Sequence, residues 1–154
     1  MYLSDSQQAL AGVFVRGIHV GPKASTAYTA ATPQTLFTIT GGRVLVTRLM
    51  AVVTTLHASA TNNISTATVP ATGSAVTLSS TLDTNALEAG ATLYVEGDGT
   101  ATVKANGGVV LSSATGGGFI VSTGTITFLP SATQDGASSW DLWYVPIDDG
   151  AAVA

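Results

Sequence analysis

The side chains of this sequence that could do chemistry are two histidines and nine carboxylates. His19 and His57 lie far apart, and neither belongs to a spaced ligand set such as HExxH. Each is most simply a surface or cross-strand residue, and a metal site or a pH switch is the alternative. Because the sequence holds no cysteine, disulfide scaffolds, zinc ribbons and thiol catalysis are excluded.

Two acidic clusters are of the kind that act as acid–base pairs or hold calcium. Asp148 and Asp149 end a predicted strand, where neighbouring side chains point to opposite faces and do not converge. Residues 96–99 (EGDG) match part of a calcium loop, but the remaining ligands are missing. We interpret both clusters as solvated turns. The sequence therefore predicts no catalytic residue, no cofactor and no metal site, and a protein that is not an enzyme.

One segment near the end of the chain gathers three large aromatic residues, Trp140, Trp143 and Tyr144. On a strand, Trp140 and Tyr144 share one face and Trp143 lies on the other. A strand with an aromatic on both faces is either central in a sandwich or covered on its outer side by a neighbouring subunit. We therefore expect both tryptophans to be largely buried in the assembled protein. The alternative is an open aromatic platform for a sugar.

The composition indicates a protein that lives packed against other protein. Only 9% of the 154 residues are charged and 45% are hydrophobic, whereas about 25% charge is usual in a globular domain. Charge keeps soluble monomers apart, so a chain with little of it is suited to assembly. The net charge is −4 and the five basic residues are scattered, which argues against nucleic acid as a partner.

Nothing in the sequence predicts membrane insertion or secretion. No basic region precedes the apolar residues of the N-terminus, as a signal peptide requires. The longest apolar stretch, residues 44–56, is interrupted by polar residues and is shorter than the roughly 20 residues of a membrane helix. We expect the protein to be made in the cytoplasm and to have no membrane partner.

The elements that must position these side chains are β-strands. Short runs rich in β-branched residues alternate with glycine turns, and no helical pattern of 10–15 residues separates them. This pattern is typical of an antiparallel β-sandwich, with a jelly roll as the first choice. The predicted strands are residues 12–20, 35–40, 43–56, 75–82, 92–96, 100–105, 109–112, 119–122, 125–129 and 138–147.

The chain divides into an N-terminal arm, residues 1–34 with one short strand, and a sandwich domain, residues 35–154. Residues 21–34 and 57–74 are small, polar and contain prolines, and they are predicted as extended arms or loops. The arm has too little apolar area to fold alone. We expect it to contact a neighbouring subunit or another protein, so deleting residues 1–10 should weaken binding more than folding.

Two segments together carry a family resemblance. Residues 40–47 (TGGRVLVT) and the C-terminal run from Thr125 to Ala151, which ends in WDLWYVPIDDGA, resemble a group of small structural proteins of tailed bacteriophages. The resemblance covers roughly residues 36–152. It implies a capsid decoration (cement) protein that forms a homotrimer on the outer surface of the major capsid lattice and stabilises the head. The protein would then be located on the virion.

We expect subunit or capsid contacts at eight residues: Tyr2, Leu3, Phe14, Arg16, Tyr28, Trp140, Trp143 and Tyr144. The main alternative function is a virion surface protein of tail or head fibre type that binds carbohydrate or a host receptor. A hydrolase of unknown type is the least favoured hypothesis, because no catalytic pattern supports it.

Overall fold

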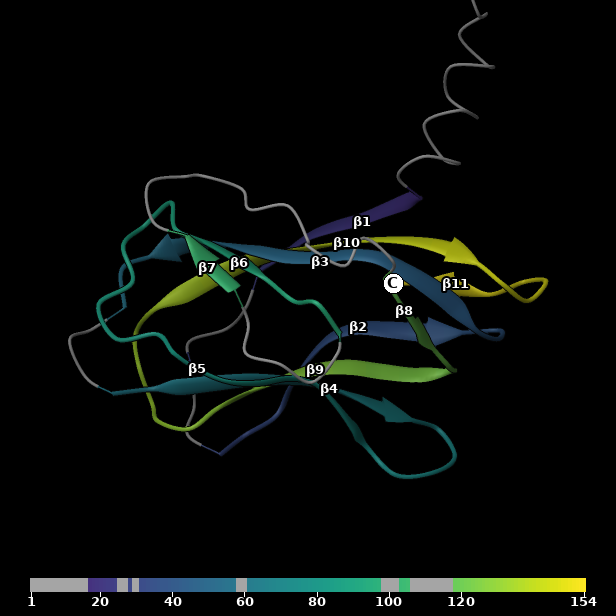
Figure 1. Cartoon of the computed structure of the whole chain (residues 1–154), viewed down its shortest axis with the longest axis horizontal. Coiled ribbons are helices and arrows are strands. Elements are labelled where there is room, and N and C mark those ends of the chain that lie inside the picture. Colours follow the sequence, from purple (N-terminus) through teal and green to yellow (C-terminus); the bar gives the residue numbers. More distant parts are fainter. Residues whose placement is uncertain (1–16, 25–27, 29–30, 58–60, 98–102, 106–117) are drawn as a thin grey trace, which may run out of the picture.

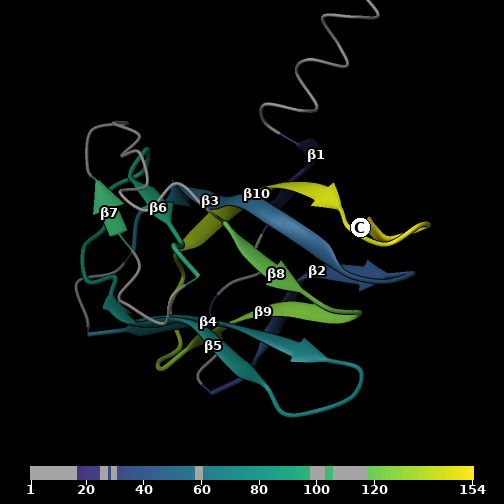
Figure 2. The same cartoon turned by 45° about the vertical axis from the view of Figure 1, so that its right-hand side comes forward.

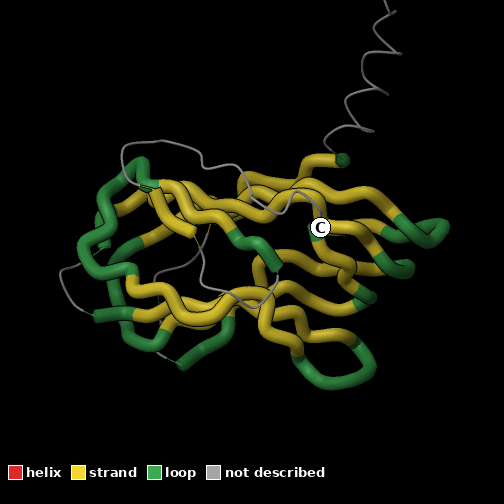
Figure 3. The backbone as a smooth tube through the Cα atoms, in the orientation of Figure 1, coloured by secondary structure: helices red, strands yellow, loops and turns green. Residues whose placement is uncertain are grey.

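The computed structural model describes residues 17–24, 28, 31–57, 61–97, 103–105 and 118–154. Within these residues the protein has eleven strands and no helix, and Figure 3 shows strands joined by loops throughout. The strands form two antiparallel sheets that pack together (Figure 1). An all-β antiparallel sandwich was the prediction from sequence, and the structure confirms it at this level.

The first sheet is built around the longest strand, β3 (Val44–Thr55). β10 (Ala137–Pro146) pairs along one side of β3, and β1 (Ile18–Ala24) follows β10 at the edge. On its other side β3 pairs with β6 (Thr92–Tyr94) and, nearer its start, with β8 (Phe119–Val121). β7 (Val103–Ala105) follows β6 and completes the sheet, in the order β1-β10-β3-β6-β7.

The second sheet has the order β11-β2-β9-β4-β5. Its strands are β11 (Ala152–Val153), β2 (Gln34–Thr40), β9 (Gly124–Pro130), β4 (Asn63–Pro70) and β5 (Val76–Asp83). Figure 2 shows the two layers separated, with β8 crossing the open side between β3 and β9.

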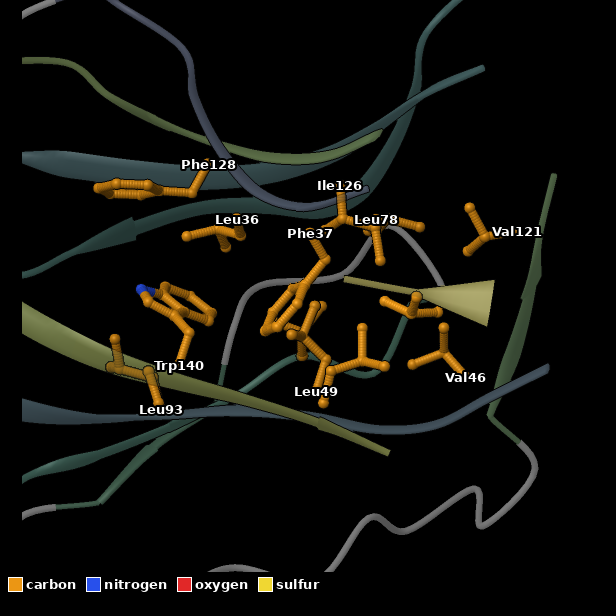
Figure 4. Close-up of a cluster of buried hydrophobic side chains, with 14 of the residues drawn as sticks. Leu36, Phe37, Val46, Leu49, Leu78, Leu93, Val121, Ile126, Phe128 and Trp140 are labelled. Atoms are coloured by element: carbon orange, nitrogen blue, oxygen red, sulfur yellow. The ribbon is translucent and has the colours of Figure 1, made fainter. Parts of the chain in front are cut away.

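The core lies between the sheets and is filled by inward side chains of both (Figure 4). Trp140 and Leu142 are fully buried and Tyr144 is 5% exposed, so β10 alternates as its sequence predicts. Phe128 of the second sheet lies 5.9 Å from Trp140, between ring centroids. This alternation places Asp141, Trp143 and Val145 on the outer side of the first sheet.

The structure corrects the prediction that residues 57–74 form a loop. Residues 63–70 are β4, a strand that pairs with β9 on one side and β5 on the other. The inward positions of β4 are Ile64, Thr66 and Thr68, so two of the three carry hydroxyls. Buried threonines disguise the apolar alternation by which a strand is usually recognised.

The predicted arm also contributes to the sandwich. Residues 21–24, predicted as loop, belong to β1, and the described part of the predicted strand 12–20 is Ile18–Val20. Tyr28 is fully buried and its backbone bridges to Gln134. β1 and Tyr28 thus lie in the sheet and the core, although the sequence places them in the arm. Residues 1–16 and the predicted strand 109–112 fall outside the described residues.

Candidate functional site

The outer side of the first sheet is the surface that distinguishes this molecule. Cross-strand partners point to the same side of a sheet, so the register arranges the outward side chains in rows across β10, β3 and their neighbours. These rows define what is called here the apolar sheet face. They are Val145–Leu45–Ile120, His19–Trp143–Arg48, Asp141–Met50–Tyr94 and Ser139–Val52.

Apolar side chains dominate this face. Ile120 is 63% exposed, the highest value among the large hydrophobic residues of the described chain. Leu45, Met50, Val52 and Val145 are each partly exposed on strands whose inward neighbours are buried. An outward face of a sheet normally alternates to polar residues, because it meets water. An apolar patch in its place makes this face a candidate site of interaction.

Trp143 lies between two charged or polar neighbours on this face. The imidazole of His19 stacks on the indole, with ring centroids 4.6 Å apart and planes inclined by 30°. From the other side, the Arg48 guanidinium carbon lies 5.7 Å from the indole centroid, a cation–π contact. His19 belongs to β1 and Arg48 to β3, the two strands that flank β10. The indole therefore lies between the side chains of His19 and Arg48.

A polar contact links this row to the row of Asp141. His19 Nε2 lies 2.7 Å from Asp141 Oδ1, so the carboxylate accepts a hydrogen bond from the ring when that nitrogen carries a proton. The two side chains are 43% and 22% exposed. Pairs of this exposure contribute little to stability, about 0.2–1 kcal/mol. Their effect on the face is to fix the orientation of His19 against Trp143.

The outer side of the second sheet is chemically different. Its cross-strand rows carry mainly hydroxyls, and its exposed apolar side chains, Leu129 and Val69, lie in separate rows. The hydroxyl residues of this face are Thr35, Thr38, Ser65, Thr77, Thr125 and Thr127. The two outer faces of the sandwich therefore differ, and only the apolar sheet face is of the kind that a partner usually covers.

As far as the described residues form them, the edges of both sheets are poorly suited to pairing with another strand. β7 has three residues and β11 two, which is too short to template an addition. The register of β1 shifts between Val20 and Lys23, around Pro22, and that of β5 shifts at two places against β4. Bulges, proline and short strands are the devices by which sheets avoid edge-to-edge association. Contact with other proteins is therefore expected through a face.

The second histidine is a core residue and not a surface or cross-strand one. His57 is 1% exposed, and neither of its ring nitrogens has a hydrogen-bond partner. Its ring meets that of Tyr28 edge-on, with centroids 4.8 Å apart. Burial lowers the pKa of His57, an effect that the charge of Asp135 partly opposes. Among the described residues no three His, Asp or Glu side chains gather as a metal site would need.

The acidic turn at the end of β10 is more structured than predicted. Asp148 accepts hydrogen bonds from the Arg43 guanidinium at 2.7 and 2.9 Å and from the Arg43 backbone N–H at 2.7 Å. These bonds lower the pKa of Asp148 to about 2. Asp149 is exposed. The Arg43–Asp148 pair ties the turn before β3 to the turn after β10.

The structure separates the predicted contact residues into groups. Trp143 lies on the apolar sheet face, whereas Tyr28, Trp140 and Tyr144 are core side chains with no free surface for a partner. Tyr2, Leu3, Phe14 and Arg16 lie outside the described residues. Sequence reasoning missed Leu45, Met50, Val52 and Ile120. The signal for three of them was the near-continuous apolar run of residues 43–56, which places apolar side chains on both faces of one strand.

Comparison with models of protein families, with curated proteins and with solved structures finds no match for this chain. The described residues contain no helix long and apolar enough to cross a membrane.

Proposed function

We propose that the protein is a structural subunit of a virion, a capsid decoration protein of a tailed bacteriophage. In this proposal it assembles as a homotrimer, binds the outer surface of the major capsid lattice and stabilises the head. The observation that carries the structural role is the apolar sheet face. The phage assignment rests on the resemblance of residues 40–47 and of the C-terminal run 125–151.

The physical argument for a structural role combines the face with the composition. Burial of apolar surface contributes about 25 cal/mol per Å² removed from water. A standard interface covers about 800 Å² on each partner. With 9% charged residues the chain has little electrostatic repulsion to oppose such burial. A protein with this surface is favoured as a permanent member of an assembly.

The strand connections support the jelly-roll form of the sandwich as part of this proposal. β2 pairs with β9 in one sheet, while the following β3 pairs with β8, which precedes β9, in the other. Two consecutive strand pairs thus cross together from sheet to sheet. This arrangement is the one by which a jelly roll wraps a long hairpin around a core.

The alternative of carbohydrate or receptor binding is less well supported. A sugar platform needs an open aromatic face, but His19 and Arg48 occupy the surroundings of Trp143 on both flanking strands. Trp140 is fully buried and cannot contribute. The described groups with clearly shifted pKa values form two separate pairs, Tyr28 with His57 in the core and Arg43 with Asp148 at a turn. The first pair is buried and the second is an exposed ion pair, so neither favours an enzymatic role.

Capsid binding tests the proposal directly. Phage heads lacking the protein would be mixed with the purified full chain and sedimented through a sucrose cushion. We expect the chain to pellet with the heads at saturating, fixed stoichiometry and to raise the temperature at which the heads release DNA. Failure to bind the heads, together with selective retention on a glycan array, would replace this function with the carbohydrate-binding one.

A further inference from the structure

We infer that the apolar sheet face is covered by a second copy of this chain, so that it is the subunit–subunit interface and not the surface that meets the capsid. The inference rests on the proposed function and assigns a partner to the site that carries it. Three features of the molecule support it: the apolar character of the face, its low charge, and the short or bulged edges of the sheets.

The chemistry of the face favours a permanent contact. Five aliphatic or thioether side chains, with Trp143 and Tyr94, make up most of its rows. Interfaces of obligate homo-oligomers are more apolar than those between partners that also exist apart. A capsid subunit is met only after the protein has been made and folded. A copy of the same chain is present from the start and can cover the face at once.

The charge distribution permits two copies to approach through this face. Of the described acidic residues only Asp141 belongs to the rows, and it is paired with His19. Arg48 adds one positive charge, which lies against Trp143. Most of the other described acids lie away from these rows: Asp83 ends β5, and Asp135 and Asp149 lie in turns. Glu96 is the exception, because it follows Val95, whose N–H donates to the Leu49 carbonyl next to Arg48. Self-association through the face therefore brings few like charges together.

The short and bulged edges disfavour the other common way in which β-proteins associate, which is edge-to-edge pairing of strands. Addition of a strand from a second copy would need a long, regular, unprotected edge, and each edge strand is short or bulged. Packing of one sheet against a surface of another subunit needs no free backbone groups. The contact then resembles the interior of the sandwich, with sheets about 10 Å apart.

A matched pair of lysine variants tests the inference without any capsid. Ile120→Lys places a charge on the face, at the end of its Val145–Leu45–Ile120 row, and Leu129→Lys places one on the hydroxyl face, where the native side chain is 39% exposed. In light scattering we expect an oligomer for the wild type and for Leu129→Lys, and a monomer for Ile120→Lys with an unchanged far-ultraviolet circular dichroism spectrum. A wild type that is monomeric at micromolar concentration would overturn the inference, as would an Ile120→Lys variant of unchanged mass.

Cysteine labelling gives a second readout, which is made on the intact oligomer. The chain has no cysteine, so each single variant reports one position. In an isolated chain Ile120 is more exposed than Leu129, at 63% against 39%. We expect the order of maleimide labelling rates to be reversed in the oligomer, with Ile120→Cys protected and Leu129→Cys reactive. Rapid labelling of Ile120→Cys, or protection in a chain of monomer mass, would overturn the inference. Capsid binding is measured separately, so either hypothesis can fail alone.

Discussion

At the scale of single residues, the two histidines show how one residue type takes two roles. His19 lies on an exposed face, stacked on Trp143 and paired with Asp141. His57 lies in the core with no hydrogen-bond partner for either nitrogen. Gly136 makes this placement possible, because a side-chain carbon at residue 136 would lie 2.9 Å or less from three atoms of the imidazole ring. The neutral imidazole therefore behaves as a flat core residue.

The burial of His57 predicts an acid-sensitive fold. Its folded-state pKa is lowered below the ordinary value of 6.5, so the unfolded chain binds the proton more readily. Stability from this group is therefore complete above pH 6.5 and is lost as the pH falls below that value. In urea unfolding from pH 7.5 to 5, we expect His57→Leu to abolish most of this pH dependence, whatever its effect on absolute stability. An unchanged slope in His57→Leu would contradict the prediction.

The two tryptophans should respond differently to truncation. Trp140 is fully buried against Phe128, and removing such a side chain costs about 3–5 kcal/mol. Trp140→Ala should therefore lower the melting temperature strongly or prevent folding. Trp143→Ala removes an outward side chain, so we expect a folded chain with weakened association. Calorimetry and light scattering on the two variants would measure this. Equal losses of folding stability would place Trp143 in a folding role.

At the scale of elements, the sequence is informative where inward positions are apolar and misleading where they are hydroxylic. β3, β9 and β10 were predicted within one or two residues, because their alternation or continuous apolar character is plain. β4 was missed because two of its inward side chains are threonines, which do not read as apolar in the sequence. The buried hydroxyl of one of them, Thr66, forms a hydrogen bond to β5. Thr66 Oγ1 and Ser79 Oγ lie 2.7 Å apart and are both buried, and the Thr66 N–H donates to the same Ser79 oxygen.

The Thr66–Ser79 pair predicts strong energetic coupling between β4 and β5. Removing one hydroxyl leaves the other buried without its closest partner, at a cost of about 1–3 kcal/mol. The double variant Thr66→Val/Ser79→Ala removes both groups, so its loss of unfolding free energy should be smaller than the sum of the two single losses. Chemical denaturation of the three variants measures the coupling. Additive losses would show that the two hydroxyls act independently.

The candidate site could be predicted only in part, for a reason that also belongs to the elements. The aromatic strand 138–147 was recognised, and its outward Trp143 was assigned to a contact. The neighbours of Trp143 could not be assigned, because His19 and Arg48 come from strands far apart in the sequence. The pairing of Arg43 with Asp148 was hidden for the same reason. Spacing along the chain reports local structure, whereas register between strands is set by the folded sheet.

The Arg43–Asp148 pair predicts a measurable titration. The Asp148 carboxyl should titrate near its lowered pKa of about 2, below its ordinary value of 3.8. The stability that it contributes is therefore present above pH 3.8 and is lost as the pH falls through about 2. In carboxyl-detected NMR titrations, Arg43→Gln should move the midpoint of Asp148 back towards 3.8. Since both groups are exposed, the melting temperature at pH 7 should change little. A midpoint unmoved by the substitution would mean that Arg43 does not set it.

At the scale of the whole molecule, the sandwich is asymmetric. One outer face is apolar and the other is hydroxylated, while the edges are short or bulged. A chain with a formal charge of −4 and few charged side chains of either sign can steer a partner only weakly by electrostatics. We therefore expect association through one face, without open-ended addition of strands. This arrangement suits a subunit that forms a closed assembly of defined size.

This asymmetry predicts how the assembly responds to salt. Association through the apolar sheet face should be driven by burial of apolar surface, so raising NaCl from about 0.05 to about 1 M should not dissociate the oligomer, although the Debye length then falls from more than 10 Å to about 3 Å. Sodium sulfate should strengthen it, because excluded salts favour burial of apolar surface. Light scattering over a dilution series at each salt concentration gives the dissociation constant. The Ile120→Lys variant should remain monomeric in NaCl, where screening of the introduced charge cannot restore the apolar contact. An oligomer that dissociates as NaCl rises would show that ion pairs hold it together. The interface would then lie among the charged turns and not on the apolar sheet face.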